Sequence, residues 1–234
     1  MKIEGSVFLV TGGTRGIGRA LVEALLERAA RVVFCGRAAQ SVGEACVSLK
    51  KWRDAVIGVP CDVAKDEECH ALVQAATTAF GRVDCLVNNA ATLAPLAPVT
   101  ETPPAVWQEV LAVNVLGTVN MIRHTLPGMQ RRGSGAIVNI SSGWGRFGEA
   151  RVASYCASKF AVEGLSQSVA AEAGDGIAVV ALNPGIIQTA MLARAFEGET
   201  ESYPTPEDVS PRWMRLLEKL GPAMNGKSLD LDQF

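Results

Sequence analysis

Short apolar runs alternate with longer amphipathic stretches along the whole of this 234-residue chain. The short runs are rich in β-branched residues, and they predict strands at 6–10, 31–35, 55–59, 85–88, 136–140, 178–182 and 228–231. The stretches between them predict helices at 16–29, 41–51, 66–80, 104–130, 154–173 and 206–220, the fourth starting at its proline pair. Because strands that alternate with helices form βαβ units, the pattern predicts an α/β fold. We expect one doubly wound, mostly parallel seven-stranded sheet with helices on both faces.

Composition limits both the domain count and the partners. No composition shift or repeat divides the chain, so we expect residues 1–234 to form a single domain. Its 22 basic and 24 acidic residues leave a net charge of −2 without a basic stripe, which disfavours nucleic acid as a partner. No uninterrupted apolar stretch approaches about eighteen residues, and the N-terminus lacks a cleavable leader pattern. We therefore expect a soluble cytoplasmic protein with no membrane partner.

The six cysteines predict no metal site. They fall at irregular intervals without a C-x-x-C pair, and only two histidines could join them as ligands. In a reducing compartment we interpret them as small apolar side chains of the core. Cys156 is next to Tyr155 but on a different face of the expected helix, so a catalytic thiol is the minor alternative there.

A glycine-rich turn follows the first expected strand and opens the first expected helix. Its residues are Thr11, Gly12, Gly13, Thr14, Arg15, Gly16, Ile17 and Gly18. Gly12 and Gly16 permit a sharp turn and a close approach to a pyrophosphate, and Gly18 permits close packing of helix on sheet. The free N–H groups of the helix N-terminus would bind the anion. The alternative is a turn that needs its glycines only to reverse direction.

The residue after the second strand indicates which dinucleotide would bind. Gly36-Arg37 stands where an acidic residue usually binds the 2′-hydroxyl of NAD. Arginine instead forms charge-assisted hydrogen bonds with the 2′-phosphate of NADP, and Arg15 could add a second positive charge. The sequence therefore favours NADP(H) over NAD(H). The alternative is that both arginines are ordinary solvent-exposed residues.

Tyr155 and Lys159 lie four residues apart at the start of a long helical pattern, and Ser142 precedes Tyr155 by thirteen residues. A spacing of four places the phenol and the ammonium on one helix face. A nearby cation lowers the pKa of a phenol, so we expect Lys159 to make Tyr155 a usable acid or base near neutral pH.

Together these segments resemble the short-chain dehydrogenase/reductase family over about residues 5–190, with a weaker echo near 225–231. Besides the glycine turn, the resemblance rests on Cys61-Asp62-Val63, on Asn88-Asn89-Ala90-Ala91, on Asn114, on Ser142, Tyr155 and Lys159, and on Asn183 through Thr189. It implies a Rossmann-type domain. The cofactor-binding residues that it implies, together with Gly12, Thr14, Arg15, Gly16, Ile17 and Gly18 of the glycine turn and with Arg37, are Asp62, Val63, Asn89, Ala90, Tyr155, Lys159, Pro184, Gly185, Ile186 and Thr189.

The resemblance also implies hydride transfer between NADP(H) and a carbonyl/alcohol pair, with a catalytic tetrad of Asn114, Ser142, Tyr155 and Lys159. Ser142 would bind the substrate oxygen, Tyr155 would exchange its proton, and Lys159 would lower the phenol pKa and bind the nicotinamide ribose. Asn114 would fix a water that links Lys159 to solvent, or it would be a buried asparagine paired with backbone. The family's serine-to-tyrosine interval selects Ser142, which leaves Ser141 as a neighbour bonded to backbone.

Three segments depart from the family pattern. Ala91 replaces a glycine, the C-terminal segment stops early so that the last strand is in doubt, and residues 188–205 form a short substrate lid carrying Met191, Leu192, Phe196 and Tyr203. Trp144, Phe147 and Leu93 are expected either to line the substrate pocket or to pack in the core.

We predict an NADP(H)-dependent oxidoreductase that reduces a small or medium, partly apolar ketone or aldehyde, as a homodimer or homotetramer. The alternative from another class is a non-catalytic NADP(H)-sensing regulatory or scaffold protein. Such a protein would need the glycine turn but not the tetrad.

Overall fold

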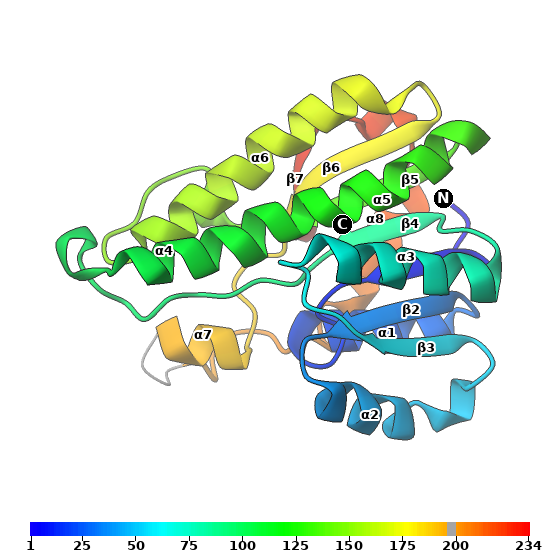
Figure 1. Cartoon of the computed structure of the whole chain (residues 1–234), viewed down its shortest axis with the longest axis horizontal. Helices are drawn as coiled ribbons and strands as arrows, with labels where there is room; N and C mark the ends of the chain where they lie inside the picture. Colours follow the sequence, from blue (N-terminus) through cyan, green and yellow to red (C-terminus); the bar gives the residue numbers. More distant parts are fainter. Residues whose placement is uncertain (196–199) are drawn as a thin grey trace.

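A computed structural model describes residues 1–195 and 200–234 of the chain, and its centre is one sheet of seven parallel strands (Figure 1). The strands are β1 (Val7–Val10), β2 (Arg31–Gly36), β3 (Val56–Pro60), β4 (Cys85–Asn88), β5 (Gly135–Ile140), β6 (Ile177–Asn183) and β7 (Ser228–Asp230). Their order across the sheet is β3-β2-β1-β4-β5-β6-β7. The predicted α/β fold with a seven-stranded parallel sheet is confirmed.

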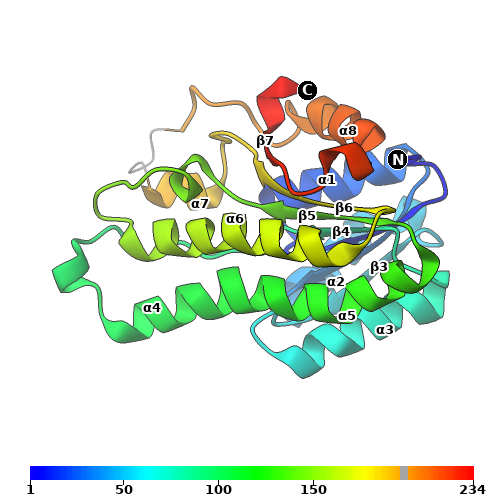
Figure 2. The ribbon, with the colours of Figure 1, turned by 90° about the horizontal axis from the view of Figure 1, so that it is seen from above.

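Helices cover both faces of the sheet because alternate strand residues point to opposite sides (Figure 2). Phe8 and Val10 pack in the cluster that contains α1, α2 and α8, whereas Leu9 packs in the cluster that contains α3, α5 and α6. These helices are α1 (Gly16–Glu27), α2 (Ala39–Ser48), α3 (Asp66–Phe80), α5 (Gly117–Arg132), α6 (Ala153–Ala173) and α8 (Ser210–Lys219).

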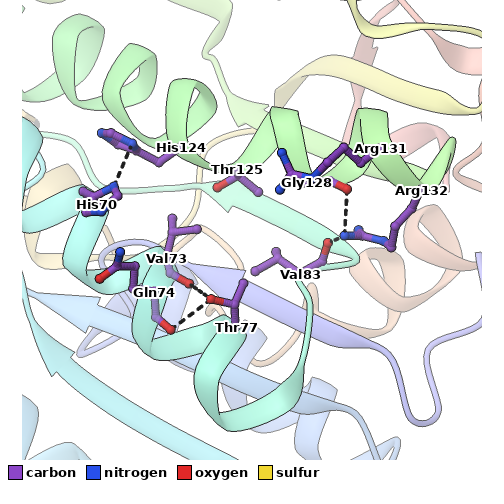
Figure 3. A pocket seen from close by; sticks show the side chains of 10 residues that line it. All are labelled: His70, Val73, Gln74, Thr77, Val83, His124, Thr125, Gly128, Arg131 and Arg132. Atoms are coloured by element: carbon purple, nitrogen blue, oxygen red, sulfur yellow. Dashed lines mark hydrogen bonds between the residues drawn. The ribbon is translucent and has the colours of Figure 1, made fainter.

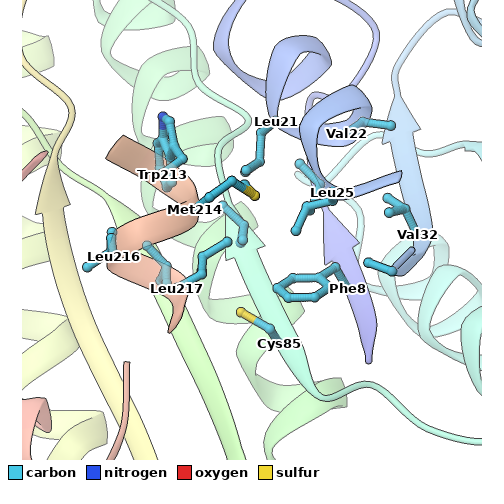
Figure 4. Packing of buried hydrophobic residues seen from close by; sticks show 14 of the residues in the cluster. Phe8, Leu21, Val22, Leu25, Val32, Cys85, Trp213, Met214, Leu216 and Leu217 are labelled. Atoms are coloured by element: carbon cyan, nitrogen blue, oxygen red, sulfur yellow. The ribbon is translucent and has the colours of Figure 1, made fainter. Parts of the chain in front are cut away.

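The core on the α1 side joins the two ends of the chain. Trp213, Met214 and Leu217 of α8 pack beside Leu21 and the rest of the α1 cluster (Figure 4). All four side chains are at most 3% exposed, and burial of such a side chain contributes about 1.5–3 kcal/mol. Residues near the C-terminus therefore complete the core that the first βα unit begins.

The strand order reverses between β1 and β4, which pair with each other at the sheet centre. Strand β2 lies on the far side of β1, and β5 lies on the far side of β4. In open α/β sheets, ligands bind outside the carboxyl ends of the strands at such a reversal. The glycine turn follows β1, Asn89 follows β4 and Ser142 follows β5, so the topology gathers the expected site at one sheet edge.

The segment predicted as one helix over 104–130 is divided. α4 (Pro104–Leu111) continues through a π-helical turn at Ala112–Leu116 into α5. As predicted, a proline stands in the first turn of α4. By length and composition alone the run Pro104–Arg132, with a mean hydropathy of 1.3, could cross a membrane, a criterion that core helices of soluble proteins also meet.

Most other elements match their predicted ranges within a few residues, and one difference has a local cause. The last predicted helix starts at Ser210 rather than at 206, because Asp208 accepts hydrogen bonds from the backbone and hydroxyl of Thr205 and so closes a turn there. The last strand, which the sequence left in doubt, is present: β7 pairs in parallel with β6, with Leu229 opposite Leu182.

Candidate active site

The glycine turn is shaped by contacts that exclude a side chain. Gly12 and Gly16 have φ of 66° and 55°, in the left-handed region that favours glycine. A Cβ on Gly18 would stand 2.3 Å from the carbonyl oxygen of Gly12. The amide of Asn89 donates to the carbonyl oxygens of Thr11 and Gly12 at 2.8 and 3.1 Å, so the segment after β4 supports the turn after β1.

The N-terminus of α1 suits a phosphate. Within the described part of the chain, no side chain caps this helix, and its first turn carries no acidic residue. Its first N–H groups therefore remain available as donors at the positive end of the helix dipole. A backbone that leaves no room for a Cβ at Gly18, followed by these donors, fits the pyrophosphate of a dinucleotide. Thr14, Arg15 and Ile17 complete this turn as predicted.

The two arginines expected to bind the 2′-phosphate are both exposed. Arg15 precedes α1, and Arg37 follows β2 with a side chain that is 73% exposed. The guanidinium of Arg37 lies 4.0 Å from the carboxylate of Glu109 on α4. So long and exposed an ion pair contributes little, and a phosphate can displace it.

Asp62 and Val63 differ in what they offer. The Asp62 carboxylate accepts a hydrogen bond from Ala64 N at 3.1 Å and is partly exposed, so it can also meet a ligand. Val63 is buried against Gly117 of α5, where a Cβ would stand 2.6 Å from its side chain. Only the backbone of Val63 is therefore suited to border an adenine.

Ser142, Tyr155 and Lys159 come together as predicted. Ser142 begins the turn after β5, and α6 carries the other two. The Ser142 hydroxyl lies near the Tyr155 phenol, whose pKa it acts to lower, and it accepts from Trp144 N at 3.2 Å. The Nζ atom of Lys159 lies 5.4 Å from the Tyr155 ring centroid and donates to the Ile140 carbonyl oxygen at 2.7 Å.

The expectation that Lys159 lowers the phenol pKa is wrong for this structure. Burial raises the pKa of Tyr155 to about 12, against an opposing effect of the Ser142 hydrogen bond. Burial also lowers the pKa of Lys159 to about 8, because its ammonium is 3% exposed and faces a carbonyl rather than an acid. Desolvation is thus the largest influence on the pKa of both groups.

The expected role of Ser141 is also wrong. Its hydroxyl is buried, and it finds no hydrogen-bond partner within residues 1–195 and 200–234. A Cβ on Gly145 would stand 2.7 Å from this oxygen. The Ser141 side chain is therefore enclosed by the turn that follows it, and only its backbone N–H, donating to Leu182 at 2.7 Å, helps to order the strand end.

Asn114 lies in the π-helical turn, and its amide is fully engaged. It accepts from Thr92 N at 2.8 Å, donates to the Thr92 carbonyl oxygen at 3.0 Å, and donates to the Ser158 hydroxyl at 3.0 Å. Its side chain thus joins the loop after β4 to α6, one residue before Lys159. Of the two expectations, the pairing of a buried asparagine with backbone describes the side chain.

The segment expected beneath the nicotinamide lies against the glycine turn. Thr189 stands 3.5 Å from the position of a Cβ on Gly16. Pro184 precedes Gly185, whose φ is 84°, and Ile186 is 48% exposed. Thr189 also accepts from Leu192 N at 3.1 Å at the start of α7 (Ala190–Ala195).

An apolar cluster surrounds Tyr155. It contains Leu93, Val152, Tyr155 and Cys156, with Trp144 and Met191 packed against it. The rings of Trp144 and Tyr155 meet edge to face, with centroids 6.1 Å apart. Phe147 is 57% exposed and does not belong to this cluster.

The expected lid is only partly a loop. Helix α7 occupies its first half, and Gln188 N donates to the Pro204 carbonyl oxygen at 2.9 Å, so the two ends of the segment meet. The position expected for Phe196 lies outside the described residues. Helix α7 was missed because the segment after Pro184-Gly185 lacks a clear apolar period.

Sequence reasoning missed three residues that build the site. Thr11 accepts from Asn89 N and Ala90 N, at 3.0 and 2.9 Å, and its place as the first residue of the glycine turn was an available signal. Ser158 bonds Asn114, and Arg146 joins distant segments. Neither has a local pattern that indicates its partner.

A hollow of about 190 Å³ between α3 and α5 lies apart from this site (Figure 3). His70 and His124 line it, with their Nδ1 atoms 3.4 Å apart, and His124 also contacts Asp66 through Nε2 at 2.9 Å. None of the tetrad residues lines it. Both histidines lie on helices, as the sequence predicts.

Comparison with known proteins agrees with this geometry. The model of the family described as short chain dehydrogenase matches residues 6–200. An NADPH-dependent pterin aldehyde reductase of Arabidopsis thaliana is 37% identical, over 97% of this chain and 93% of the relative. A D-threitol dehydrogenase of Mycolicibacterium smegmatis is 32% identical, over 99% and 93%. The structure of a short chain dehydrogenase from Shigella flexneri, complexed with NADP, superimposes with a TM-score of 0.88 at 30% identity, covering 99% of each chain.

Proposed function

Because the chain belongs to the short-chain dehydrogenase family, as an NADP(H)-dependent oxidoreductase that acts on carbonyl/alcohol pairs, we propose that it reduces a partly apolar aldehyde or ketone with NADPH. The observation that carries the proposal is the grouping of Ser142 with the buried side chains of Tyr155 and Lys159, on the sheet edge that also bears the glycine turn. A proton donor and a dinucleotide cradle thus share one edge.

Different residues would bind different parts of the cofactor. The glycine turn and the N-terminus of α1 would bind the pyrophosphate, Arg15 and Arg37 the 2′-phosphate, and Asp62 the adenine. Pro184 through Thr189 would lie along the nicotinamide. When bound, NADPH supplies a hydride to the carbonyl carbon.

The protein itself would supply the proton for the reduction, from the Tyr155 hydroxyl. With a pKa of about 12, the Tyr155 hydroxyl holds its proton throughout the neutral range, which suits a general acid for reduction. The Ser142 hydroxyl, which lies near Tyr155, would hold the same substrate oxygen. The apolar cluster around Tyr155 limits water at this point and strengthens these polar interactions.

An NADP(H) sensor without turnover is not supported. Such a protein has no need of a buried tyrosine–lysine pair beside a serine, and the relatives named above include a reductase and a dehydrogenase.

The substrate is proposed to be an aldehyde or ketone attached to a flat or apolar group. Trp144, Leu93 and Met191 pack in the cluster around Tyr155 and supply aromatic and apolar surface there. The relative from Arabidopsis reduces a pterin aldehyde, so an aromatic aldehyde of that kind belongs in the first substrate panel, beside aliphatic ketones and a polyol.

The test is NADPH oxidation with this carbonyl panel by the wild type and by Tyr155→Phe. We expect wild-type turnover of at least one carbonyl, and a loss of at least about 100-fold in kcat in the variant. NADPH binding, followed by cofactor fluorescence, should change less than about threefold, since the ring remains. Wild-type binding of NADPH without turnover of any panel member would contradict the reductase and favour the sensor.

We further propose that two copies associate through α4, α5 and α6. Leu116 is 54% exposed and Phe160 is 47% exposed, and a hollow of about 220 Å³ between α5 and α6 is lined mostly by apolar side chains. Antiparallel packing of this helix pair against its own copy about a two-fold axis would bury these groups. Cytoplasmic location is proposed on the sequence grounds alone.

A further inference from the structure

Arg146 follows the turn that carries Ser142, and its guanidinium contacts two other segments at once. Nη1 donates to both carboxylate oxygens of Asp230 on β7, at 2.8 Å each, and Nη2 donates to the Leu229 carbonyl oxygen at 2.8 Å. Nε donates to Oε1 of Glu163 on α6 at 3.2 Å. Four hydrogen bonds from one planar cation define its position closely.

Each carboxylate is held by a further partner. Glu163 lies one helical turn after Lys159, its side chain is 9% exposed, and its second oxygen accepts from the Ser228 hydroxyl. Asp230 also accepts from the amide of Asn183 at 2.9 Å, and Asn183 in turn accepts from Gly185 N at 3.1 Å. The network therefore reaches α6 on one side and the nicotinamide segment on the other.

The network is partly buried, so removing one of its charged side chains would destabilise the fold more than removing a fully exposed one. The Arg146 side chain is 30% exposed and that of Asp230 is 31% exposed. Burial alone would lower the pKa of Arg146, but the hydrogen bond to Asp230 and the charge of Glu163 raise it overall. Loss of the cation would leave two carboxylates close together without their common partner.

The turn between Ser142 and Arg146 leaves little room for adjustment. A Cβ on Gly145 would stand 3.0 Å from the backbone of Lys159, so the turn lies directly against α6. The turn is closed by Gly145 N donating to the Ser142 carbonyl oxygen at 2.9 Å. A shift of Arg146 is therefore passed to Ser142 through three residues of tightly packed chain.

We propose that Arg146 is a positioning residue, which holds the Ser142 turn in register with the Tyr155–Lys159 helix and with the Pro184–Gly185 segment through Glu163 and Asp230. This inference rests on the reductase function proposed above. A misplacement of about 1 Å at a reacting group can lower the rate of the chemical step about 100-fold. Arg146 touches neither Tyr155 nor Lys159 in the hydrogen-bond network, so its effect must pass through the segments it joins.

The test compares Arg146→Lys and Arg146→Met with the control Arg28→Met. The lysine variant keeps the charge but cannot reproduce the forked donors, and it guards against a methionine variant that fails to fold. Arg28 forms an exposed ion pair with Glu218, far along the chain from the tetrad segments. We expect kcat to fall about 10- to 100-fold in both Arg146 variants, with the NADPH dissociation constant within about threefold of wild type. The control should keep wild-type kcat.

A double-mutant comparison separates positioning from general destabilisation. If Arg146 acts by placing Ser142, then adding Arg146→Lys to Ser142→Ala should lower kcat by less than about threefold beyond the single serine variant. Fully multiplicative losses, or an Arg146→Lys enzyme with wild-type kcat, would overturn the proposal.

Hydrogen exchange supplies a readout that needs no turnover. In Arg146→Lys, the amides of Gly145 and Gly185 should exchange at least about tenfold faster, whereas Arg28→Met should leave both unchanged. If the wild type reduces no carbonyl, the reductase function fails, and exchange at these two amides still decides whether Arg146 holds the segments. Unchanged exchange in Arg146→Lys would refute the inference on its own.

Discussion

Arg37 offers the simplest change in cofactor preference. Its exposed guanidinium forms only a long ion pair of 4.0 Å with the Glu109 carboxylate, and breaking that pair to bind a phosphate would cost little. A 2′-phosphate can therefore form charge-assisted hydrogen bonds with Arg37. Arg37→Ala should raise the NADPH dissociation constant about 10- to 100-fold, since such bonds contribute about 1.5–3 kcal/mol. The NADH constant should stay within about twofold of wild type.

The measurement is cofactor titration by fluorescence, with Arg53→Ala as the matched control. The Arg53 side chain is 85% exposed beside Asp54, so its removal should change neither constant. Equal losses of NADPH and NADH binding in Arg37→Ala would rule out the phosphate contact.

Lys159 predicts how stability depends on pH. Burial lowers its pKa from 10.5 to about 8, so between these values the unfolded chain binds a proton that the folded chain has released. The free energy of unfolding therefore rises with pH across this window. Relative to Lys159→Met, the cofactor-free wild type should gain about 2–3 kcal/mol between about pH 7 and 10.

Urea unfolding at a series of pH values checks this difference. The series should stop near pH 10, because the pKa of Tyr155 is raised from 10.0 to about 12. Between these two values the folded chain keeps a proton that the unfolded chain loses, so the free energy of unfolding falls with pH there. A wild-type-minus-variant difference that stays flat from pH 7 to 10 would show that Lys159 is not desolvated as described.

At the scale of the element, the turn after β5 requires a glycine at position 145, where there is no room for a side chain. A methyl group on Gly145 would press on the Ser141 hydroxyl at 2.7 Å and on the Lys159 backbone at 3.0 Å. Gly145→Ala should therefore push the turn away from α6, with a cost of about 1–3 kcal/mol and a fall in kcat of at least about tenfold. Thermal melting and steady-state kinetics measure the two effects.

Gly148→Ala is the control for this turn. A Cβ on Gly148 would meet nothing within 4 Å, so both stability and kcat should remain near wild type. If the two alanine variants behave alike, the close packing of the turn on α6 has no functional importance.

Elements were predictable where their cause is local. The apolar runs fix the strands, and the glycine turn and the Tyr155–Lys159 spacing locate both halves of the site in the fold as observed. Desolvation of Lys159 and Tyr155 was not predictable, because it depends on how deeply α6 packs on the strand ends. The partners of Arg146 were equally hidden, since 84 residues separate it from Asp230.

At the scale of the whole molecule, the exposed apolar residues predict assembly. If the wild type associates as proposed, Phe160→Glu should convert it to a smaller species, because a charge would be buried without a partner in the proposed contact between copies. Light scattering coupled to size-exclusion chromatography gives the mass.

Val47→Glu provides the control on the opposite face. Val47 lies on α2 and is 69% exposed, more than Phe160, yet it is outside the proposed contact. Its substitution should leave the mass unchanged. A wild-type protein that is monomeric at micromolar concentration would contradict the proposed association.

The strand order has a consequence for synthesis on the ribosome. Strand β1 can pair with β2, and β2 with β3, as soon as these emerge, but the other edge of β1 must wait until Cys85–Asn88 has been made. Throughout that interval the apolar edge Val7–Val10 is open to wrong partners. Nascent chains should consequently be most prone to aggregate, and most in need of chaperones, before β4 is translated.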